Sequence, residues 1–572
     1  YDIELPFNID EFRFSFINDE INWKRNNDFK EDSTAIEVFY QLVDKYKVDR
    51  EKYSEGEARK IIGIKYLIGQ RKYPAYVPVE IASNIKEATR MSIEENKIFL
   101  PGVQIMDKPL RKYPNNDFMS HVLGYLGKIG PEQEELFNKG YSPQDMIGKS
   151  GIEYSMEEYL KGEDGSRQIE VDARGLLIDT IEVQEPIPGD TVGLTINKKL
   201  QQIAEDALKH TIKDARNKKP FPQTFSGAAV AMDPNTGAIL AMASEPGFDP
   251  NQFASGISNE DWKALQPATD DRYAPRPLIN NAISYPLPPG STMKMATAVA
   301  GLAEGKINPK EYIRCKGVYT SVAGVAPSDA GGAVHGPINL VNAIKKSCNY
   351  YFFETGRRLG GQLFEDHAVK LGFGQYTGIE LPYESKGMIE GPSYKTNLYE
   401  GYIKNYLNYT VKMSDEEAKE KIIDMIHEKP LPGQSSYQFY QDMRKRIREL
   451  GVTEDNFIDS IIWYITESRY RPGDVLNAAI GQGLNNVTVL QLANYVSTIA
   501  NGGTRYKPYL VNRIVGYDGE RKFEKKPEIV DRLNISTDDL EFIKRGMFGV
   551  ANEAGGTARG TFVGSEIAVS GK

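Results

Sequence analysis

The chain has 572 residues, more than a single hydrophobic core usually organises, so we expect at least two domains. Its 40% apolar content and mixed charges are those of a folded globular protein. The net charge of −9 argues against nucleic acid as the main partner, and two cysteines exclude a disulfide-rich scaffold.

No stretch of the sequence reaches the roughly 18–20 apolar residues that a membrane span needs, and no signal peptide is recognisable. The chain starts at Tyr1 rather than at a methionine. We therefore expect a natural N-terminal transmembrane anchor that this sequence does not include.

Residues 1–189 combine short helical stretches, such as Ser92–Asn96, with turn-rich and charged segments. Two prolines and a glycine in Pro186–Gly189 then indicate a domain boundary. From Asp190 onward the pattern is clearer. The predicted elements are a strand over Thr191–Ile196, a helix over Lys198–Asp214, a hairpin turning at Pro234–Gly237, a buried helix from about Ser291 to Gly305, and a helix between Thr488 and Asn501.

Residues 385–472 differ in texture, because they are charged and rich in tyrosine. A capping box at Ser414–Glu417 predicts the start of an amphipathic helix. We interpret this segment as a mostly helical insertion on an α+β multidomain protein.

The segment Ser291-Thr-Met-Lys294 places a serine and a lysine on one face of a predicted helix. A serine hydroxyl is a poor nucleophile near neutral pH and needs an adjacent base. A lysine can be that base if burial or a nearby cation lowers its pKa. Alone the motif is weak, because a capping serine and a surface lysine often share this spacing.

Two later features give the motif a context. Ser347-Cys-Asn349 lies between helical stretches, where its serine can relay a proton and its amide can hold a peptide. Lys572 ends an apolar strand that starts at Ile567. The order S-x-x-K, S-x-N and K-[ST]-G is the signature of penicillin-binding proteins and serine β-lactamases.

The sequence resembles the class B penicillin-binding proteins over most of residues 75–572, outside the insertion. Residues 73–105 and 147–153 are most similar to the elongation-type penicillin-binding protein 2 group, with the division-type paralogues as runner-up. The resemblance implies an elongated N-terminal pedestal (dimerisation-like) domain, 1–189, and a β-lactamase-like serine-transpeptidase domain, 190–572, with a central antiparallel sheet flanked by helices. The matching segments are 111–129, 147–175, 188–208, 229–244, 285–302, 478–511 and 556–572.

The resemblance implies a peptidoglycan D,D-transpeptidase of cell elongation and cell shape, a β-lactam target linked to antibiotic resistance. Ser291 would attack a D-Ala-D-Ala stem peptide and Lys294 would take its proton. Ser347 would pass a proton to the leaving D-alanine, Asn349 would anchor the donor, and Lys572 would keep the local field positive. No cofactor is implied for catalysis.

The implied partners are the stem peptide, β-lactams and a membrane glycan polymerase of the elongation machinery, with no nucleic acid. The implied location is the cell membrane, spanned once, with an extracytoplasmic catalytic domain. Two departures from the family pattern stand out. The chain stops at Lys572, so we expect the C-terminal end of the domain to be missing. The Arg-Gly segment and Asp-Arg-Asn-Gly turn that usually open the pedestal are also absent.

Other function classes remain open. A D,D-carboxypeptidase or a β-lactamase would use the same nucleophile, but the long pedestal argues against both. The sequence also has no recognisable deacylating glutamate motif near Ser291. A non-enzymatic alternative is a β-lactam-acylable sensor or scaffold that activates a membrane glycan polymerase.

Cys315, Asp329, His335 and Cys348 fall within 34 residues, and thiolate, carboxylate and imidazole groups all bind zinc. If Ser347 faces the cleft, Cys348 should point behind the cleft wall, where a Zn²⁺ would be structural. A Cys315–Cys348 disulfide and two buried free thiols are the competing interpretations. We expect structural roles for His121, His210, His367 and His427, and for Ile480–Gly483 either a tight turn or a close approach to the active-site rim.

Overall fold

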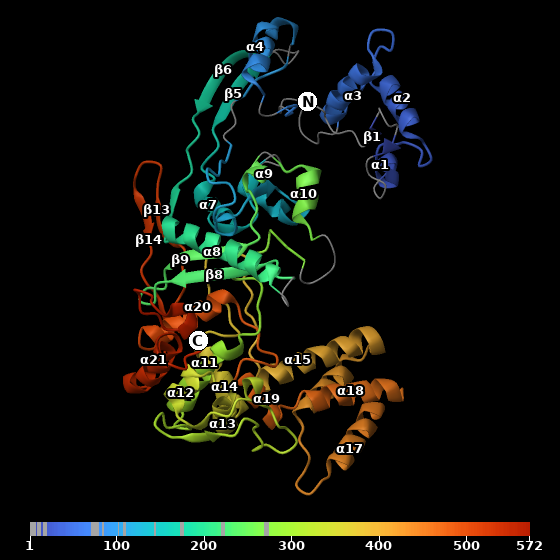
Figure 1. Ribbon diagram of the computed structural model, residues 1–572. Coiled ribbons are helices and arrows are strands. Elements are labelled where there is room, and N and C mark those ends of the chain that lie inside the picture. The colour runs from blue at the N-terminus through green and yellow to red at the C-terminus, as the bar shows by residue number, and fades with distance from the viewer. Residues whose placement is uncertain are drawn as a thin grey trace. The chain divides into compact units, whose positions relative to one another are not determined.

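The structure is a computed structural model of the chain (Figure 1). It describes residues 7–8, 13–14, 20–69, 79–82, 85–100, 102–106, 110–141, 145–171, 177–218, 223–254, 256–267 and 274–572. They form two compact units, Tyr1–Leu110 with Asp164–Pro186 and Arg111–Glu163 with Ile187–Lys572, which we describe separately. No helix in these described ranges has both the length and the apolar character needed to cross a membrane.

The first unit contains a small helical core and a long β-ribbon. The helices α1 (Glu20–Asn26), α2 (Ala35–Lys45) and α3 (Glu55–Gly69) share one apolar core, and Thr34 closes the start of α2 with a capping box. The helix predicted over Ser92–Asn96 corresponds to the second half of the helix Glu87–Glu95 (α4). The remaining elements are β1 (Phe7–Asn8), β2 (Arg13–Phe14), α4 (Glu87–Glu95), η1 (Lys97–Phe99), and the antiparallel strands β5 (Ser166–Val171) and β6 (Leu177–Gln184).

Residues 111–163 pack with the C-terminal part of the chain rather than with the first unit. Val122 and Ile152 share an apolar core with Ile239, and the Met119 amide donates to Glu205 at 2.9 Å. The domain boundary placed at residue 189 stays a prediction, although the first unit does end nearby at Pro186. The elements here are α5 (Ser120–Leu123), β3 (Leu126–Lys128), η2 (Pro131–Lys139), β4 (Met146–Gly148), α6 (Gly151–Ser155) and α7 (Glu157–Leu160).

Antiparallel strands form one layer of the second unit, as the sequence predicts. Strands β8 (Gly227–Met232) and β9 (Ile239–Glu245) pair with Val230 opposite Met242, and α8 (Lys198–Asn217) covers them (Figure 1). The Ile239 amide donates to the carbonyl of Tyr509, which lies just before a strand of a second antiparallel sheet. That sheet has the order β14-β13-β7 and consists of β7 (Thr191–Leu194), β13 (Val511–Val515) and β14 (Arg521–Glu524). The strands β12 (Thr504–Tyr506) and β15 (Ile529–Arg532) form a separate two-stranded sheet.

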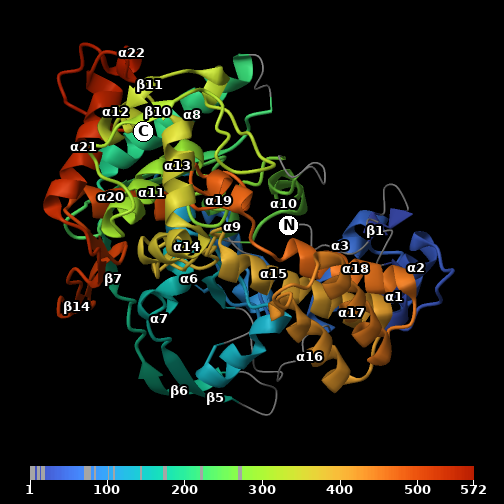
Figure 2. The same ribbon diagram turned by 90° about the horizontal axis from the view of Figure 1, so that it is seen from below.

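The central helix α11 (Met293–Ala303) is buried at every residue from Met293 to Leu302, and the short helix η3 (Gly290–Thr292) leads into it. The helix predicted between Thr488 and Asn501 is α20 (Val489–Ala500), and Thr488 caps it with a capping box. Helices surround α11 (Figure 2). They are α12 (Leu340–Lys345), α13 (Asn349–Leu359), α14 (Gly361–Lys370), α19 (Pro472–Ala478), α20 (Val489–Ala500) and α21 (Thr537–Asn552), and smaller elements are α9 (Asn251–Ala254), α10 (Asn259–Leu265), β10 (Ile313–Cys315), η4 (Ala330–Gly332), β11 (Gly336–Ile338) and α22 (Arg559–Phe562).

The segment predicted as a helical insertion consists of helices that surround a separate apolar core (Figure 1). The predicted capping box at Ser414–Glu417 is wrong by one residue, because Asp415 caps the helix and accepts the Ala418 amide. The elements are α15 (Pro392–Asn405), the π-helix η5 (Tyr406–Val411), α16 (Glu416–Asp424), η6 (Met425–His427), α17 (Ser436–Glu449) and α18 (Asp455–Glu467).

Candidate active site and the cluster behind it

Ser291 lies in η3, immediately before the buried helix α11. Gly290 before it has a φ of 55°, a left-handed conformation that favours glycine. The Gly290 amide donates to the carbonyl of Gly481 at 3.0 Å, which fixes the backbone just ahead of the serine. Ser291 is half-buried and therefore reachable from solvent, while Lys294 one turn later is fully buried.

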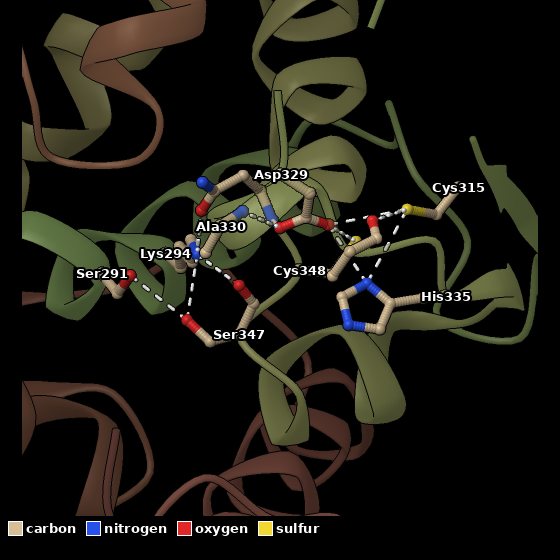
Figure 3. Close-up of polar contacts among 10 residues, drawn as sticks. Ser291, Lys294, Cys315, Asp329, Ala330, His335, Ser347 and Cys348 are labelled. Atoms are coloured by element: carbon tan, nitrogen blue, oxygen red, sulfur yellow. Dashed lines mark hydrogen bonds and ion pairs between the residues drawn. The ribbon is translucent and has the colours of Figure 1, made fainter. Parts of the chain in front are cut away.

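Lys294 is held by the Ser347–Asn349 segment (Figure 3). Its Nζ donates to the Ser347 carbonyl at 2.8 Å, to Ser347 Oγ at 3.1 Å and to Asn349 Oδ1 at 2.6 Å. Burial lowers the pKa of Lys294 to about 8, although the nearby Asp329 and Cys348 oppose this shift. The neutral amine is therefore accessible near physiological pH, as a general base requires.

Ser347 connects the lysine to the nucleophile. Its Oγ lies 3.2 Å from Ser291 Oγ, so a hydrogen-bonded path runs from Ser291 through Ser347 to Lys294 (Figure 3). Ser347 lies in the bend between α12 and α13 with a φ of 55°. Such left-handed non-glycine residues cost roughly 1–3 kcal/mol and persist where the surroundings hold them.

Lys572 contacts the end of α12, just before the same bend. Its Nζ donates to the Ile344 carbonyl at 2.8 Å, and the amide of Gly571 donates to Met547. Burial and the neighbouring charge of Lys294 lower the pKa of Lys572 to about 7. The sequence-predicted residues Ser291, Lys294, Ser347, Asn349 and Lys572 therefore lie around one bend of the chain.

The predicted metal ligands meet on the opposite side of that bend. One ligand atom from each of Cys315, Asp329, His335 and Cys348 lies within 4.8 Å of all the others (Figure 3). Asp329 Oδ2 is 3.5 Å from Cys315 Sγ, 3.0 Å from Cys348 Sγ and 3.1 Å from His335 Nδ1. His335 Nδ1 is 3.7 Å from Cys315 Sγ.

Four of the six separations are near those of a tetrahedral metal site. Ligands bound to zinc at 2.0–2.3 Å lie roughly 3.3–3.8 Å apart. The four separations given above are 3.0–3.7 Å, and all six lie within 4.8 Å. The two sulfurs are free thiols rather than a disulfide in this structure. Burial and the hydrogen bond to Asp329 raise the pKa of the Cys348 thiol, so a cation is needed to make it a thiolate at neutral pH.

Asp329 joins the two clusters, which the sequence did not predict. Its Oδ2 faces the thiols, while its Oδ1 accepts the backbone amides of Asn349 and Ala330, both at 2.9 Å. The carboxylate therefore caps the start of α13, the helix that presents Asn349. In the sequence, Asp329 is followed by Ala-Gly-Gly, and this pattern does not predict a hydrogen bond to Asn349, 20 residues later.

The glycine turn combines both of its sequence interpretations, and the structural roles expected for the other histidines stay a prediction. The turn Ile480–Gly483 both bends tightly, with positive φ at Gly481 and Gly483, and approaches Gly290 at the rim of the site. His121 contacts Pro277, His210 contacts Asp214, His367 contacts Glu304, and His427 contacts Glu400.

Comparison with known proteins assigns the family. The family model described as penicillin binding protein transpeptidase domain matches residues 227–572. The chain belongs to this family. A second family model, penicillin-binding protein dimerisation domain, matches residues 8–194 and agrees with the predicted N-terminal pedestal.

The chain is also similar to individual members of the family. It is 27% identical over 485 residues to the peptidoglycan D,D-transpeptidase MrdA of Acinetobacter baumannii, which covers 84% of this chain. The chain spans only 59% of the length of that relative.

Solved structures share the fold. A penicillin-binding protein (PBP2) in complex with MreC from Helicobacter pylori has a TM-score of 0.63 and 23% identity, covering 93% of this chain and 80% of its own. A chain of the structure described as structural coordination of polymerization and crosslinking by a peptidoglycan synthase complex has a TM-score of 0.60 and 26% identity, covering 89% of this chain and 73% of its own.

Proposed function

We propose that the chain carries the activity of a peptidoglycan D,D-transpeptidase in cell elongation. The observation that supports this most is the hydrogen-bonded path from Ser291 through Ser347 to the buried Lys294. Membership of the transpeptidase family and likeness to proteins named peptidoglycan D,D-transpeptidase support the reaction class. The family resemblance supplies the substrate, a D-Ala-D-Ala stem peptide, and β-lactams as its mimics.

In the first half-reaction, Ser291 Oγ attacks the carbonyl carbon of the penultimate D-alanine. Its proton moves along the hydrogen-bonded path through Ser347 Oγ to the neutral amine of Lys294. The Ser291 amide stabilises the oxyanion of the tetrahedral intermediate. When the peptide bond breaks, Ser347 delivers a proton to the leaving D-alanine amine, and the donor stays attached as an acyl-serine.

In the second half-reaction, an amine of a neighbouring stem peptide attacks the acyl-serine. The same path accepts the amine proton and returns a proton to Ser291 Oγ, so the enzyme is regenerated. Asn349 holds the donor during both steps, and Lys572, whose pKa is lowered to about 7, adds positive charge to the site only where it is protonated.

A cross-linking reaction tests this function. Full-length protein is incubated with a D-Ala-D-Ala stem peptide and an amine acceptor, and mass spectrometry follows both free D-alanine and the cross-linked dimer. We expect both products in equal amounts, and neither with Ser291→Ala. Release of D-alanine without a dimer would indicate a carboxypeptidase, and a stable acyl-enzyme without turnover would indicate a sensor.

We also propose that Cys315, Asp329, His335 and Cys348 bind a structural Zn²⁺. The four ligand types and their mutual distances support this assignment. The metal takes no part in the chemistry, because its ligands lie behind the segment that carries Ser347. Elemental analysis should find about one zinc per chain, lost in Cys315→Ser. No metal together with two titratable thiols would contradict the proposal.

For location and partners, we propose a cell-membrane protein whose catalytic unit lies outside the cytoplasm and works with a membrane glycan polymerase. Likeness to a chain of a peptidoglycan synthase complex supports this partner. Co-purification of the full-length protein with a glycan polymerase from membranes tests it, and failure to associate would contradict it.

A further inference from the structure

The helical insertion begins and ends next to the same turn of the catalytic unit. Its first helix α15 starts at Pro392, and its last helix α18 leads through α19 directly into Ile480–Gly483. Lys395 Nζ in α15 donates to Asp474 Oδ2 in α19 at 2.7 Å, so the two ends are tied together. Figure 1 shows α19 between the insertion helices and the catalytic helices α13 and α14.

The segment that follows this turn lies between two other segments of the chain and is hydrogen-bonded to both. On one side, Met388 and Asn486 exchange two backbone hydrogen bonds, of 2.7 and 2.9 Å, just before the insertion. On the other side, Leu287 and Val487 exchange two bonds of 2.9 Å, just before the nucleophile. Together with the bond from Gly290 to the turn, these contacts connect the base of the insertion to the backbone that carries Ser291.

Two buried side chains fasten the middle segment to the insertion side. Asn485, 0% exposed, accepts the Glu390 amide at 2.8 Å and donates to the carbonyls of Ala478 at 3.2 Å and Gln482 at 3.0 Å. Glu390, 4% exposed, accepts the Leu484 amide at 2.8 Å through its carboxylate. Each residue thus holds the backbone of the other's segment.

The turn leaves little room for adjustment. A Cβ atom on Gly483 would lie 1.9 Å from a carboxylate oxygen of Glu390, and one on Gly481 would lie 2.1 Å from the carbonyl oxygen of Gly290. The turn is therefore closely packed against Glu390 on one side and against the residue before Ser291 on the other. A displacement at Glu390 has to move the turn or break its hydrogen bonds.

We infer that Glu390 and Asn485 are positioning residues for the nucleophile, through which the base of the helical insertion holds Gly481 against Gly290. This rests on the proposed function, because it concerns the rate at which Ser291 is acylated. Loss of either side chain frees the Gly481 carbonyl to shift. The Ser291 hydroxyl and amide then lose their alignment with the attacked carbonyl, and misplacement by about 1 Å can cost roughly a hundredfold in rate.

The test separates binding from acylation. Benzylpenicillin is mixed with full-length protein at several concentrations, and rapid quenching with mass spectrometry gives the acylation constant k2 and the apparent dissociation constant. We expect Asn485→Ala and Glu390→Ala to lower k2 by about tenfold to a hundredfold with little change in the dissociation constant. Glu390→Gln keeps the acceptor for the Leu484 amide and should restore k2 to within about twofold of wild type.

A matched control comes from Glu365, which is 8% exposed and accepts the amides of Ser393 and Tyr394, both at 2.9 Å, at the start of α15. It holds the insertion helix but not the turn, so Glu365→Ala should lower the melting temperature and leave k2 unchanged. If Asn485→Ala does not fold, Asn485→Asp replaces it, because its side chain still accepts the Glu390 amide but places a carboxylate oxygen against the two carbonyls to which Asn485 donates.

Three results would overturn the inference: k2 within twofold of wild type in Glu390→Ala and the Asn485 variant, an equal loss in Glu365→Ala, or no recovery in Glu390→Gln. Failure of the wild-type protein to acylate at all would instead overturn the proposed function, so the two failures are distinguishable.

Discussion

The bend that carries Ser347 and Asn349 separates two buried polar clusters. On the side of Ser291, the ammonium of Lys294 donates to three oxygens, and the Ser347 hydroxyl links it to the nucleophile. On the rear side, two thiols, an imidazole and the carboxylate of Asp329 converge on one another. The two clusters share the backbone of residues 347–349. They differ in their charged groups, because the first contains the lysine cation and the second contains the Asp329 carboxylate.

This difference in charge predicts different roles for the two clusters. The cluster around Lys294 contains a cation whose pKa is lowered to about 8, so its charge can change during a reaction near neutral pH. The rear cluster gathers the ligands of the proposed zinc, so we expect it to contribute to stability rather than to chemistry. Asp329 connects the two clusters, because its carboxylate caps the helix that presents Asn349.

The largest expected effect is in the cluster around Lys294. Lys294→Ala removes the proton acceptor and should lower the rate of benzylpenicillin acylation by about 10²–10⁴, because loss of a general base typically costs this much. Rapid-quench mass spectrometry gives the rate, and saturation behaviour shows whether reversible binding is kept. An unchanged acylation rate would show that another group takes the proton.

The pH dependence of acylation should follow the same lysine. Only the neutral amine accepts a proton, and its pKa is lowered to about 8, so the rate should rise about tenfold per pH unit up to that pH and then level off. In Lys294→Ala the rising limb should disappear. A wild-type rate that stays constant between roughly pH 6 and 8 would contradict the role of Lys294.

Disruption of the rear cluster should have a smaller effect on rate and a clear effect on stability. A ligand present at 100–1,000 times its dissociation constant stabilises a protein by about 3–4 kcal/mol, so chelation or His335→Ala should lower the melting temperature. Acylation should slow severalfold, since Asp329 loses its fixed position at the start of α13. A disulfide would behave differently, because reductant rather than chelator would then destabilise the protein.

The smallest expected effect comes from the first unit. All the site residues named above lie in the second unit, so deletion of residues 1–110 should leave the acylation rate within about twofold of wild type. A chain that starts at Asp190 should instead be unstable, because it lacks Val122 and Ile152 from the core around Ile239. Equal stability of the two shortened proteins would contradict this placement of residues 111–163.

Much of the second unit's fold was predictable because its signals are local. The hairpin at Pro234–Gly237, the buried helix after Ser291 and the cap at Thr488 each depend on residues within a few positions of one another. The packing of residues 111–163 on the second unit was not predictable from periodicity, because it depends on contacts such as Met119 with Glu205 that are distant in sequence.

The candidate site divides in the same way. Ser291, Lys294, Ser347 and Lys572 were predictable because motifs of fixed spacing mark them. No sequence motif identifies the contacts of Asp329 with Asn349 or of Asn485 with Glu390. Each contact is a hydrogen bond between a side chain and a remote backbone amide, and only the folded chain brings these partners together.

Covalent labelling of Ser291 tests the central claim most directly. Full-length protein treated with benzylpenicillin, digested and analysed by mass spectrometry should carry one adduct per chain, located between Pro289 and Lys294. The adduct should be absent in Ser291→Ala, because no other hydroxyl is joined to Lys294 through Ser347 among the contacts of the described residues. An adduct elsewhere, or a folded wild-type protein that carries none, would contradict the account.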